Sequence, residues 1–502
     1  MEQREQWGTR AGFILAAVGS AVGLGNIWRF PYVAYENGGG AFLIPYFFAL
    51  LTAGIPILIL EFGLGKRGGG SAPLTFYRLS KKWEWLGWWQ VMICLVISLY
   101  YGAIIAWAMS YIKFSATQAW GDDTQAFLFG DYLKLTENVW DIGGMQLQVL
   151  LPLTLVWAIV FITLYAGIKK GIETAGKFML PLLLVLFAII AIRSITLPGA
   201  SVGLNHFFTP DWSKVWDYKT WLAAYGQIFF SLSVAFAIMI TYSSYLPKKS
   251  DVNNNAFITA FSNSGFELFA GITVFSAIGF MAVQSNVPVS EVAAGGVGLA
   301  FIVFPKIIST LPAMNGIFGI LFFGSLMLAG LTSLISIVEV IVAAFMNKFS
   351  LQRRNAAVIV CIIGYLGSLI FATGSGLHFL DIFDHFINNY GVALAGLAEV
   401  ILLGWFYKKL TALREENNRV SDFAIGGWWE IMIRFVTPAV LLFIAYKNIV
   451  DEFAKPYGDY PWGVIAPLGL GVSVGALLLG LLFTVMKWHR VPSPHYEEDN
   501  QK

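Results

Sequence analysis

Residues 19–31, Gly-Ser-Ala-Val-Gly-Leu-Gly-Asn-Ile-Trp-Arg-Phe-Pro, interrupt an apolar segment that is long enough to cross a membrane. Apolar residues continue from Ala11 to Val18 and from Tyr32 to Ala34, so the interruption lies at membrane depth. A backbone group without a hydrogen-bond partner is costly in hydrocarbon unless the protein or a ligand satisfies it. Freed carbonyls can coordinate cations, and freed amides can hold a carboxylate. The segment is therefore the first candidate for a binding site.

The composition places the rest of the chain in a membrane as well. Hydrophobic residues make up 57% of the 502 residues and charged residues 12%, about half the charged fraction of a soluble domain. A net charge of +2 argues against a nucleic-acid partner. Cys94 and Cys361 both lie in apolar runs and indicate no disulfide framework. We expect an all-α, polytopic membrane protein in contact with membrane lipid.

Twelve apolar segments are each long enough, at about 20 residues, to span a bilayer. They lie near 11–36, 40–65, 88–114, 148–168, 177–197, 220–245, 256–282, 315–346, 355–373, 379–407, 428–449 and 461–487. An even number of spans places both termini on one side. The basic loops on that side carry Lys66, Arg67, Lys169, Lys170, Lys248, Lys249, Arg353, Arg354, Lys408 and Lys409. Because Lys and Arg accumulate in cytoplasmic loops, we expect a protein of the plasma membrane with both termini in the cytoplasm.

Two regions between the spans differ from ordinary loops. Residues 115–147 are acidic, and we expect them to be extracellular and partly folded. Residues 283–314 are moderately apolar and rich in Gly and Pro, which is consistent with a hairpin cap over an outer vestibule.

The sixth segment is also interrupted by polar residues. Gln227, Ser231 and Ser233 stand within the apolar stretch 227–236. If the first ten segments form two five-helix repeats, the first and the sixth occupy matching positions, and paired interruptions of this kind indicate a transporter site at the midplane. The alternative is that these side chains only link helices through hydrogen bonds.

Motifs at four separate places resemble the neurotransmitter:sodium symporter family. They are Gly-Leu-Gly-Asn-Ile-Trp-Arg-Phe-Pro-Tyr at 23–32, Glu-Asn-Gly-Gly-Gly-Ala-Phe at 36–42, and the segments Gly226–Phe230 and Ala329–Ser333. The resemblance implies a LeuT-type fold of 12 helices with a 5+5 inverted repeat and broken helices 1 and 6. The implied organisation is a cytoplasmic segment 1–10, repeats at 11–197 and 220–407, two further helices at 428–487 and a cytoplasmic tail at 488–502.

The resemblance also implies two sodium sites. The first would use the carbonyls of Ala21 and Ser231, the side-chain oxygens of Asn26, Ser231 and Asn263, and the substrate carboxylate. The second would use the carbonyls of Gly19, Val22 and Ala329 and the hydroxyls of Thr332 and Ser333. Neutral oxygen ligands bind an ion weakly enough to release it, whereas a carboxylate-rich cage would suit calcium.

The substrate class follows from Gly23 in the same comparison. Family members that carry monoamines have an aspartate at this position to pair with the amine, so Gly23 favours a substrate that brings its own carboxylate. That carboxylate would meet sodium, the amides of Leu24 and Gly25 and the hydroxyl of Tyr101. The amine would face the carbonyls of Ala21 and of Phe230 or Ser231, and the hydroxyl of Ser233. The side-chain pocket would be Ile97, Phe230, Phe236, Leu334 and Ile337, which fits a neutral, hydrophobic, small-to-medium α-amino acid.

Charged residues match the family's two gates. Arg29 and Asp384 correspond to an outer ion pair that closes above the substrate, because either charge alone at depth would be costly. Arg4, Trp7 and Tyr245 correspond to the inner gate. Asn347 stands where the usual aspartate would sit, so we expect weaker inward closure.

Glu267 stands where chloride-dependent relatives usually have Ser beside a bound chloride. With Tyr46 and Gln227 as neighbours, its carboxylate would replace that anion and remove the need for chloride. A proton carrier for the return step and a structural role are the alternatives. The roles of Glu61, Glu339 and Glu399 are left open by the sequence.

These patterns predict a sodium-coupled symporter that imports an amino acid by alternating access, and no enzyme. A channel would need a continuous polar pore, and a membrane enzyme would need a cluster of catalytic groups that the five histidines do not form. The remaining alternatives are a sodium-coupled carrier of another small amine with a carboxylate, such as an ω-amino acid, and a sodium-independent exchanger of the same fold.

Overall fold

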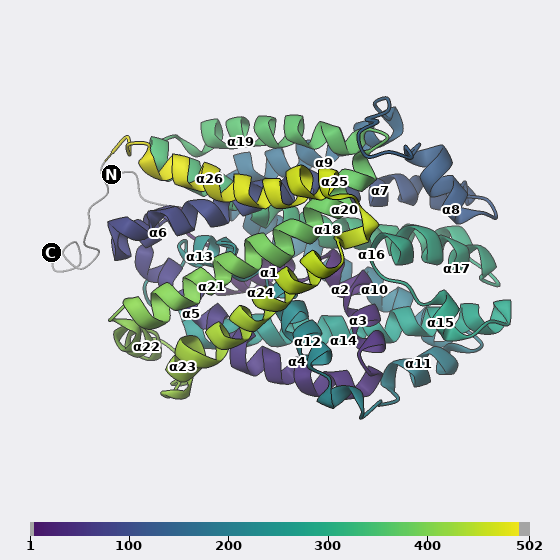
Figure 1. Cartoon of the computed structure of the whole chain (residues 1–502), viewed down its shortest axis with the longest axis horizontal. Coiled ribbons are helices and arrows are strands. Elements are labelled where there is room, and N and C mark those ends of the chain that lie inside the picture. The colour runs from purple at the N-terminus through teal and green to yellow at the C-terminus, as the bar shows by residue number, and fades with distance from the viewer. Residues whose placement is uncertain (1–4, 491–502) are drawn as a thin grey trace.

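The computed structural model describes residues 5–490, and within this range the chain is built from helices, with a single isolated β-bridge between Met145 and Thr373. The helices run side by side along the long axis of the molecule, and the described chain begins and ends at the same end of the bundle (Figure 1). We call this the terminal end and the other the far end.

Ten helical stretches in the described chain are long and apolar enough to cross a membrane. They are Gly39–Gly68, Lys81–Thr117, Leu147–Tyr165, Ile168–Ile195, Val252–Ser285, Asn315–Phe349, Arg353–Ala372, Gly376–Phe406, Trp428–Asp459 and Trp462–Val485. The main helices within them are α5 (Ile55–Gly68), α7 (Glu84–Thr117), α9 (Leu147–Tyr165), α10 (Thr174–Ile195), α14 (Val252–Ser285), α18 (Asn315–Phe349), α19 (Arg353–Ser368), α20 (Gly376–Phe386), α21 (Ala393–Ile401), α24 (Thr437–Ala454) and α26 (Gly471–Val485). The all-helical membrane fold predicted from the sequence is confirmed.

The first predicted span is broken where the sequence indicated. Helices α1 (Arg10–Ala21) and α2 (Leu24–Trp28), which α3 (Phe30–Glu36) continues, meet at a bend of 53°. Counting this bent pair as one span gives up to eleven. The sixth predicted span consists of two shorter helices, α12 (Tyr218–Ser231) and α13 (Ile238–Ser243), and is not among the eleven. The predicted count of twelve therefore depends on treating α12 and α13 as one broken span.

The break between α12 and α13 has an unusual backbone. Ser233, Ala235 and Ala237 all adopt left-handed conformations, with φ of 55°, 71° and 69°. Residues with a β-carbon seldom adopt this region, and they do so where the surrounding structure fixes them. The interruption is therefore imposed by tertiary contacts as well as by local sequence.

Shorter helices cover the far end. The acidic loop contains α8 (Thr124–Ala126), and α11 (Ala200–Phe208) lies between the fifth and sixth segments. The region rich in Gly and Pro folds into α15 (Val289–Val292), α16 (Gly296–Gly298) and α17 (Phe304–Thr310). Figure 1 shows α8, α11, α15 and α17 grouped at the end opposite the termini.

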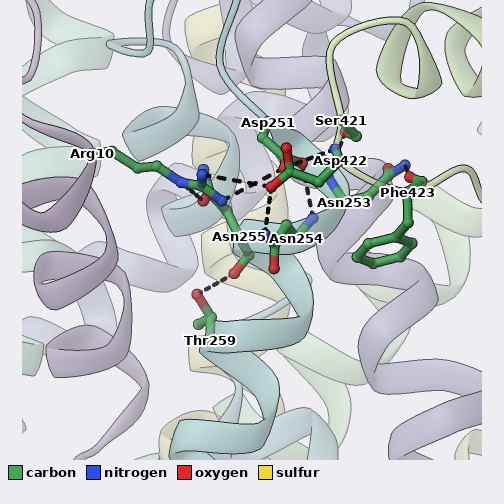
Figure 2. Close-up of polar contacts among 9 residues, drawn as sticks. All are labelled: Arg10, Asp251, Asn253, Asn254, Asn255, Thr259, Ser421, Asp422 and Phe423. Carbon is green, nitrogen blue, oxygen red and sulfur yellow. Dashed lines mark hydrogen bonds and ion pairs between the residues drawn. The ribbon is translucent and has the colours of Figure 1, made fainter.

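At the terminal end, a polar cluster fixes the start of α1 (Figure 2). Arg10 lies 3.6 Å from Asp251 and 3.9 Å from Asp422, and its Nε donates to Asn255 at 3.0 Å. Burial opposes ionisation of Asp251, but hydrogen bonds from the N–H groups of Asp422 and Asn254 outweigh it and lower the pKa of this carboxyl below its usual value. The cluster joins α1 to the start of α14 and to the loop after α22 (Leu410–Asn418).

A buried ion pair joins α18, α7 and the last described residues. The Lys348 side chain is 0% exposed, and its Nζ lies 2.7 Å from Glu84 Oε1. Trp88 and Trp488 each donate an indole N–H to Glu84, at 3.0 and 3.1 Å. Lys348 Nζ also lies 4.6 Å from the centre of the Trp488 ring, a cation–π distance. The pair therefore ties three distant segments together.

Replacing Lys348 by Met should destabilise the protein by about 3–5 kcal/mol, because it leaves Glu84 buried without a counter-charge. The double variant Lys348→Met/Glu84→Gln should recover most of this loss, since Gln removes the charge and keeps one oxygen that can accept from an indole N–H. Thermal unfolding of the purified protein measures both, with the exposed Lys82→Met as the control. Equal losses in the single and double variants would show that the charge pair does not matter.

Candidate functional site

The break in the first span is stabilised by side chains of α2 and α7. Val22 ends α1 with extended backbone angles, φ −74° and ψ 91°, so its carbonyl leaves the helical pattern. The freed N–H of Gly23 donates to Asn26 Oδ1 at 2.9 Å, and the N–H of Leu24 donates to Tyr101 Oη at 3.3 Å. Side chains therefore satisfy both freed amides at the break.

Three of the predicted first-site side chains form one continuous chain of hydrogen bonds. Asn26 Nδ2 donates to Asn263 Oδ1 at 2.8 Å, and Asn263 Nδ2 donates to Ser231 Oγ at 3.0 Å. Asn26 belongs to α2, Asn263 to α14 and Ser231 to the end of α12. The structure thus brings the two broken segments together around neutral amide and hydroxyl oxygens.

The residues predicted for the second site also lie close together. A β-carbon at Gly19 would lie 3.5 Å from Thr332 Cβ, which places α1 directly against α18. Thr332 Oγ1 and Ser333 Oγ both donate to the Ala329 carbonyl, at 3.0 and 3.2 Å. Ser333 Oγ is also 3.1 Å from the Ser20 carbonyl of α1. The oxygens at this contact are again all neutral.

The break in the sixth segment is supported by buried carboxylates. Glu61 Oε1 accepts from the Ala235 N–H at 2.6 Å, while Gln90 Nε2 bridges the Ala235 carbonyl at 3.3 Å and Glu399 at 2.6 Å. Ser233 Oγ donates to the Ser20 carbonyl at 3.0 Å and connects the two breaks. Glu61 and Glu399, whose roles the sequence left open, therefore hold the unwound backbone.

A cavity of about 60 Å³ lies between the breaks. The predicted site residues that line it are Ala21, Gly25, Asn26, Ile97, Tyr101, Phe230, Ser231, Ser233, Phe236, Ser333, Ile337 and Asp384. A β-carbon at Gly23 would reach to 2.9 Å from Ser333 Oγ and 3.0 Å from Tyr101 Oη, so only glycine keeps this part of the cavity open. The space is small and is bounded by polar groups on one side and apolar groups on the other.

Two of the predicted contact residues do not line the central cavity. Leu24 lines a separate, larger cavity, although its N–H, the group predicted to contact the substrate, donates to Tyr101 of the central cavity. Leu334 is 0% exposed and does not line the central cavity. It lies beside Gly102 of α7, because a β-carbon at Gly102 would be 3.8 Å from Leu334 Cδ2. Ile337, one turn further along α18, lines the central cavity in its place.

The larger cavity has a volume of about 600 Å³ and opens above Phe230. Both predicted outer-gate residues line it, but no ion pair within 4.0 Å joins Arg29 to Asp384 in the described structure. Arg29 instead lies 4.6 Å from the centre of the Phe230 ring, and Asp384 accepts from Tyr100 at 2.8 Å and Asn388 at 2.9 Å. The expected closed pair is therefore separated in this structure.

Glu267 is fully buried one turn after Asn263 on α14. Gln227 Nε2 donates to its Oε1 at 2.6 Å, and the hydroxyl of Tyr46 donates to its Oε2. The three residues grouped by the sequence comparison are thus in contact. The hydrogen bonds to this carboxylate come from neutral groups.

The terminal end holds an inner network that the sequence predicted only in part. Trp7 donates its N–H to the Tyr245 carbonyl at 3.2 Å and its indole N–H to the Tyr242 carbonyl at 2.9 Å. Arg4 lies outside the described residues. Asn347, expected to weaken this gate, accepts from the Ser71 N–H at 2.8 Å.

Arg353 provides the charge at this inner network. Its guanidinium donates to both oxygens of Glu339 at 2.7 and 2.9 Å, and its Nε lies 2.5 Å from Glu5. Tyr245 Oη completes the group by donating to Glu339 at 2.6 Å. In the sequence, Arg353 is recognisable only as part of a basic loop. The one signal that could have distinguished it is its position 14 residues after a glutamate in an apolar segment.

The comparisons with known proteins agree with this geometry. The model of the Sodium:neurotransmitter symporter family matches residues 4–127 and 121–491. An uncharacterized sodium-dependent transporter of Methanocaldococcus jannaschii is 43% identical over 492 residues, covering 97% of this chain and 99% of that protein. The sodium-dependent dopamine transporter of Bos taurus is 29% identical, covering 99% of this chain and 76% of that protein. The sodium- and chloride-dependent GABA transporter 2 of Bos taurus is 30% identical, covering 92% and 83%.

These relatives are transporters and not enzymes, and the family match covers almost all of the chain. The broken first span and the helical membrane fold are consistent with that match. The chain belongs to the sodium:neurotransmitter symporter family.

Proposed function

We propose that this protein imports a neutral α-amino acid together with sodium ions. The observation that carries the proposal is the hydrogen-bonded chain Asn26–Asn263–Ser231, which joins both helix breaks beside a small cavity. Sodium-dependent transport by the relatives supports it. Sodium is then a co-substrate that occupies two sites.

The donor groups suit sodium chemically. At the first site, amide N–H groups of Asn26 and Asn263 join the side chains of Asn26, Asn263 and Ser231, so rotation of the two amides would turn their oxygens toward a cation beside the Ser231 hydroxyl. At the second site, Ser333 donates to the Ser20 carbonyl of α1, and Gly19 of α1 lies against Thr332. Neutral ligands allow release on the other side of the membrane, which transport requires.

The substrate is proposed to lie with its carboxylate against the break in the first span. The N–H of Leu24 and the hydroxyl of Tyr101 are adjacent there, at the start of α2, where the helix dipole favours an anion. Gly23 leaves this corner free of a fixed carboxylate. Ile97, Phe236 and Ile337 bound the opposite side, which fits a small apolar side chain.

Glu267 is proposed to make transport independent of chloride. Its carboxylate lies one turn from Asn263 and accepts only from neutral donors among its hydrogen-bond partners. A negative charge there offsets a sodium ion in a site of low dielectric constant, where an unbalanced ion is costly.

The domain and gate assignments complete this proposal. Two inverted repeats, 11–197 and 220–407, would move relative to each other around the midplane site. The cluster of Arg353, Glu339 and Tyr245, with Trp7 beside it, would act as the inner gate. The terminal end would face the cytoplasm, because the basic loops lie there.

Coupling to sodium predicts that substitutions of the proposed sodium ligands weaken binding or abolish uptake. Asn26→Ala should weaken both sodium and substrate binding, because the substrate carboxylate shares that ion. Thr332→Ala/Ser333→Ala should abolish uptake of radiolabelled amino acid driven by a sodium gradient. Ser325→Ala is the matched control on α18, since its hydroxyl bonds only to the Leu321 carbonyl. Full uptake with choline in place of sodium would exclude the proposal.

The shape of the cavity predicts a change in side-chain selectivity. Ile337→Ala enlarges the central cavity and should improve transport of larger amino acids relative to alanine by roughly 10- to 200-fold, the range expected for one or a few methylene groups. Ile335→Ala removes the same volume at a buried position that does not line the cavity and should leave the ranking unchanged. Competition by Gly, Ala, Val, Leu, Phe and Trp gives the ranking. A similar shift in both variants would contradict the assigned pocket.

Chloride independence can be tested at one residue. Wild-type uptake should not change when gluconate replaces chloride at fixed sodium and pH. Glu267→Ser should become chloride-stimulated, because it opens a space for the anion beside Tyr46 and Gln227. Glu267→Gln removes the charge without opening that space and should be slow with or without chloride. Chloride stimulation of the wild type would assign the carboxylate another role.

A further inference from the structure

The terminal end carries a third cavity, of about 530 Å³, that shares no lining residue with the two cavities near the breaks. It lies between the loop that follows α5, including α6 (Ala72–Leu79), and the end of the span Gly376–Phe406. Its lining residues are Arg67, Gly68, Thr75, Tyr77, Arg78, Leu79, Ser80, Lys81, Trp83, Phe406, Tyr407, Lys408 and Lys409.

The lining is strongly cationic. Five of these residues carry a positive charge, and none of the lining residues carries a carboxylate. Glu416, which pairs with Arg67 at 3.5 Å, lies outside the cavity lining. A concave site with several cations on its walls concentrates a positive field and favours an anionic ligand.

The two arginines are positioned by the protein. The Arg67 side chain is only 14% exposed, and Arg78 Nη1 donates to the Gly68 carbonyl. Guanidinium groups held in this way have a fixed orientation and bind phosphate through paired N–H groups. Lys81 and Lys408 are exposed at the same cavity and add mobile charge.

Aromatic residues place the cavity at the level of the membrane surface. Trp405 and Phe406, which end the span, are 63% and 62% exposed. Tyr77 and Trp83 line the cavity itself. Exposed aromatic residues at the end of a span mark the interface between hydrocarbon and headgroups. Basic pockets between helices at this level are typical sites for acidic headgroups.

We propose that this cavity binds the phosphate group of an anionic lipid in the leaflet at the terminal end. The arginines grip the phosphate, the lysines neutralise its charge, and the exposed Phe406 contacts the acyl chains. A lipid held there links the α6 loop to the end of the tenth predicted span. The proposal does not depend on the identity of the transported substrate.

Thermal unfolding of the purified full-length protein in a neutral detergent tests this site. The melting temperature is followed while dioctanoyl phosphatidylglycerol, dioctanoyl phosphatidylcholine or inorganic phosphate is added. Phosphatidylglycerol should stabilise the wild type. Lys81→Gln/Lys408→Gln, which leaves both arginines in place, should raise the half-saturating lipid concentration by about 5- to 30-fold, because each basic residue near a membrane surface contributes modestly.

The control variant Lys82→Gln/Arg419→Gln removes two exposed charges that do not line the cavity. It should respond to phosphatidylglycerol within twofold of the wild type. Equal loss in both variants, or equal stabilisation by phosphatidylcholine, would overturn the proposal. Inorganic phosphate that stabilises at the same concentrations and with the same dependence on Lys81 and Lys408 would support the anion site and identify its ligand as the free anion rather than the lipid.

Discussion

Backbone N–H and C=O groups inside a membrane need hydrogen-bond partners, and this requirement determines the arrangement at the centre of this protein. Where α1 and α12 end, three amides outside the helical pattern receive side-chain partners: Asn26 of α2 for Gly23, Tyr101 of α7 for Leu24 and Glu61 of α5 for Ala235. These contacts hold each break in place, and Ser233, which donates to the Ser20 carbonyl, holds the two breaks next to each other. A midplane site made from backbone follows from this requirement.

The buried carboxylates fall into two groups by their partners. Glu84 and Glu339, near the terminal end, each contact a cation from a distant segment and act as fixed links. Glu61, Glu267 and Glu399, near the breaks, receive their hydrogen bonds from amides or hydroxyls. A buried negative charge with only neutral donors is costly. It can be offset by a proton or by a transported cation, so the second group lies where charge is expected to change during transport.

Sequence patterns predicted features that depend on local chemistry. Gly and Asn in the first segment, and Gln and Ser in the sixth, marked the two breaks because such residues are unusual in an apolar membrane helix unless other groups satisfy them. The fifth span was predicted to start at 177, whereas its helical stretch starts at Ile168. Lys169 and Lys170 lower the local hydropathy, yet both are exposed on a helical turn.

Features that depend on the rotation of a helix or on pairing between distant residues could not be predicted from the sequence. Leu334 and Ile337 are both apolar, and only the packing of α18 shows that Ile337 faces the cavity. Arg353 and Glu339 belong to different helices, so their bidentate pair appears only when those helices meet. The separation of Arg29 from Asp384 depends on the conformation and not on the residues present.

Because Arg29 and Asp384 are separated, the far end of the molecule is less tightly closed than the terminal end. Above the breaks, a cavity of about 600 Å³ lies between charges that do not touch. Below them, Arg353, Glu339 and Tyr245 form a buried network, and Arg10 contacts Asp251 and Asp422 nearer the surface. Exposed pairs contribute about 0–1 kcal/mol, whereas breaking a buried pair costs several times more. In the proposed transport cycle, opening toward the terminal end would be limited mainly by the pair between Arg353 and Glu339, which would need new partners or water.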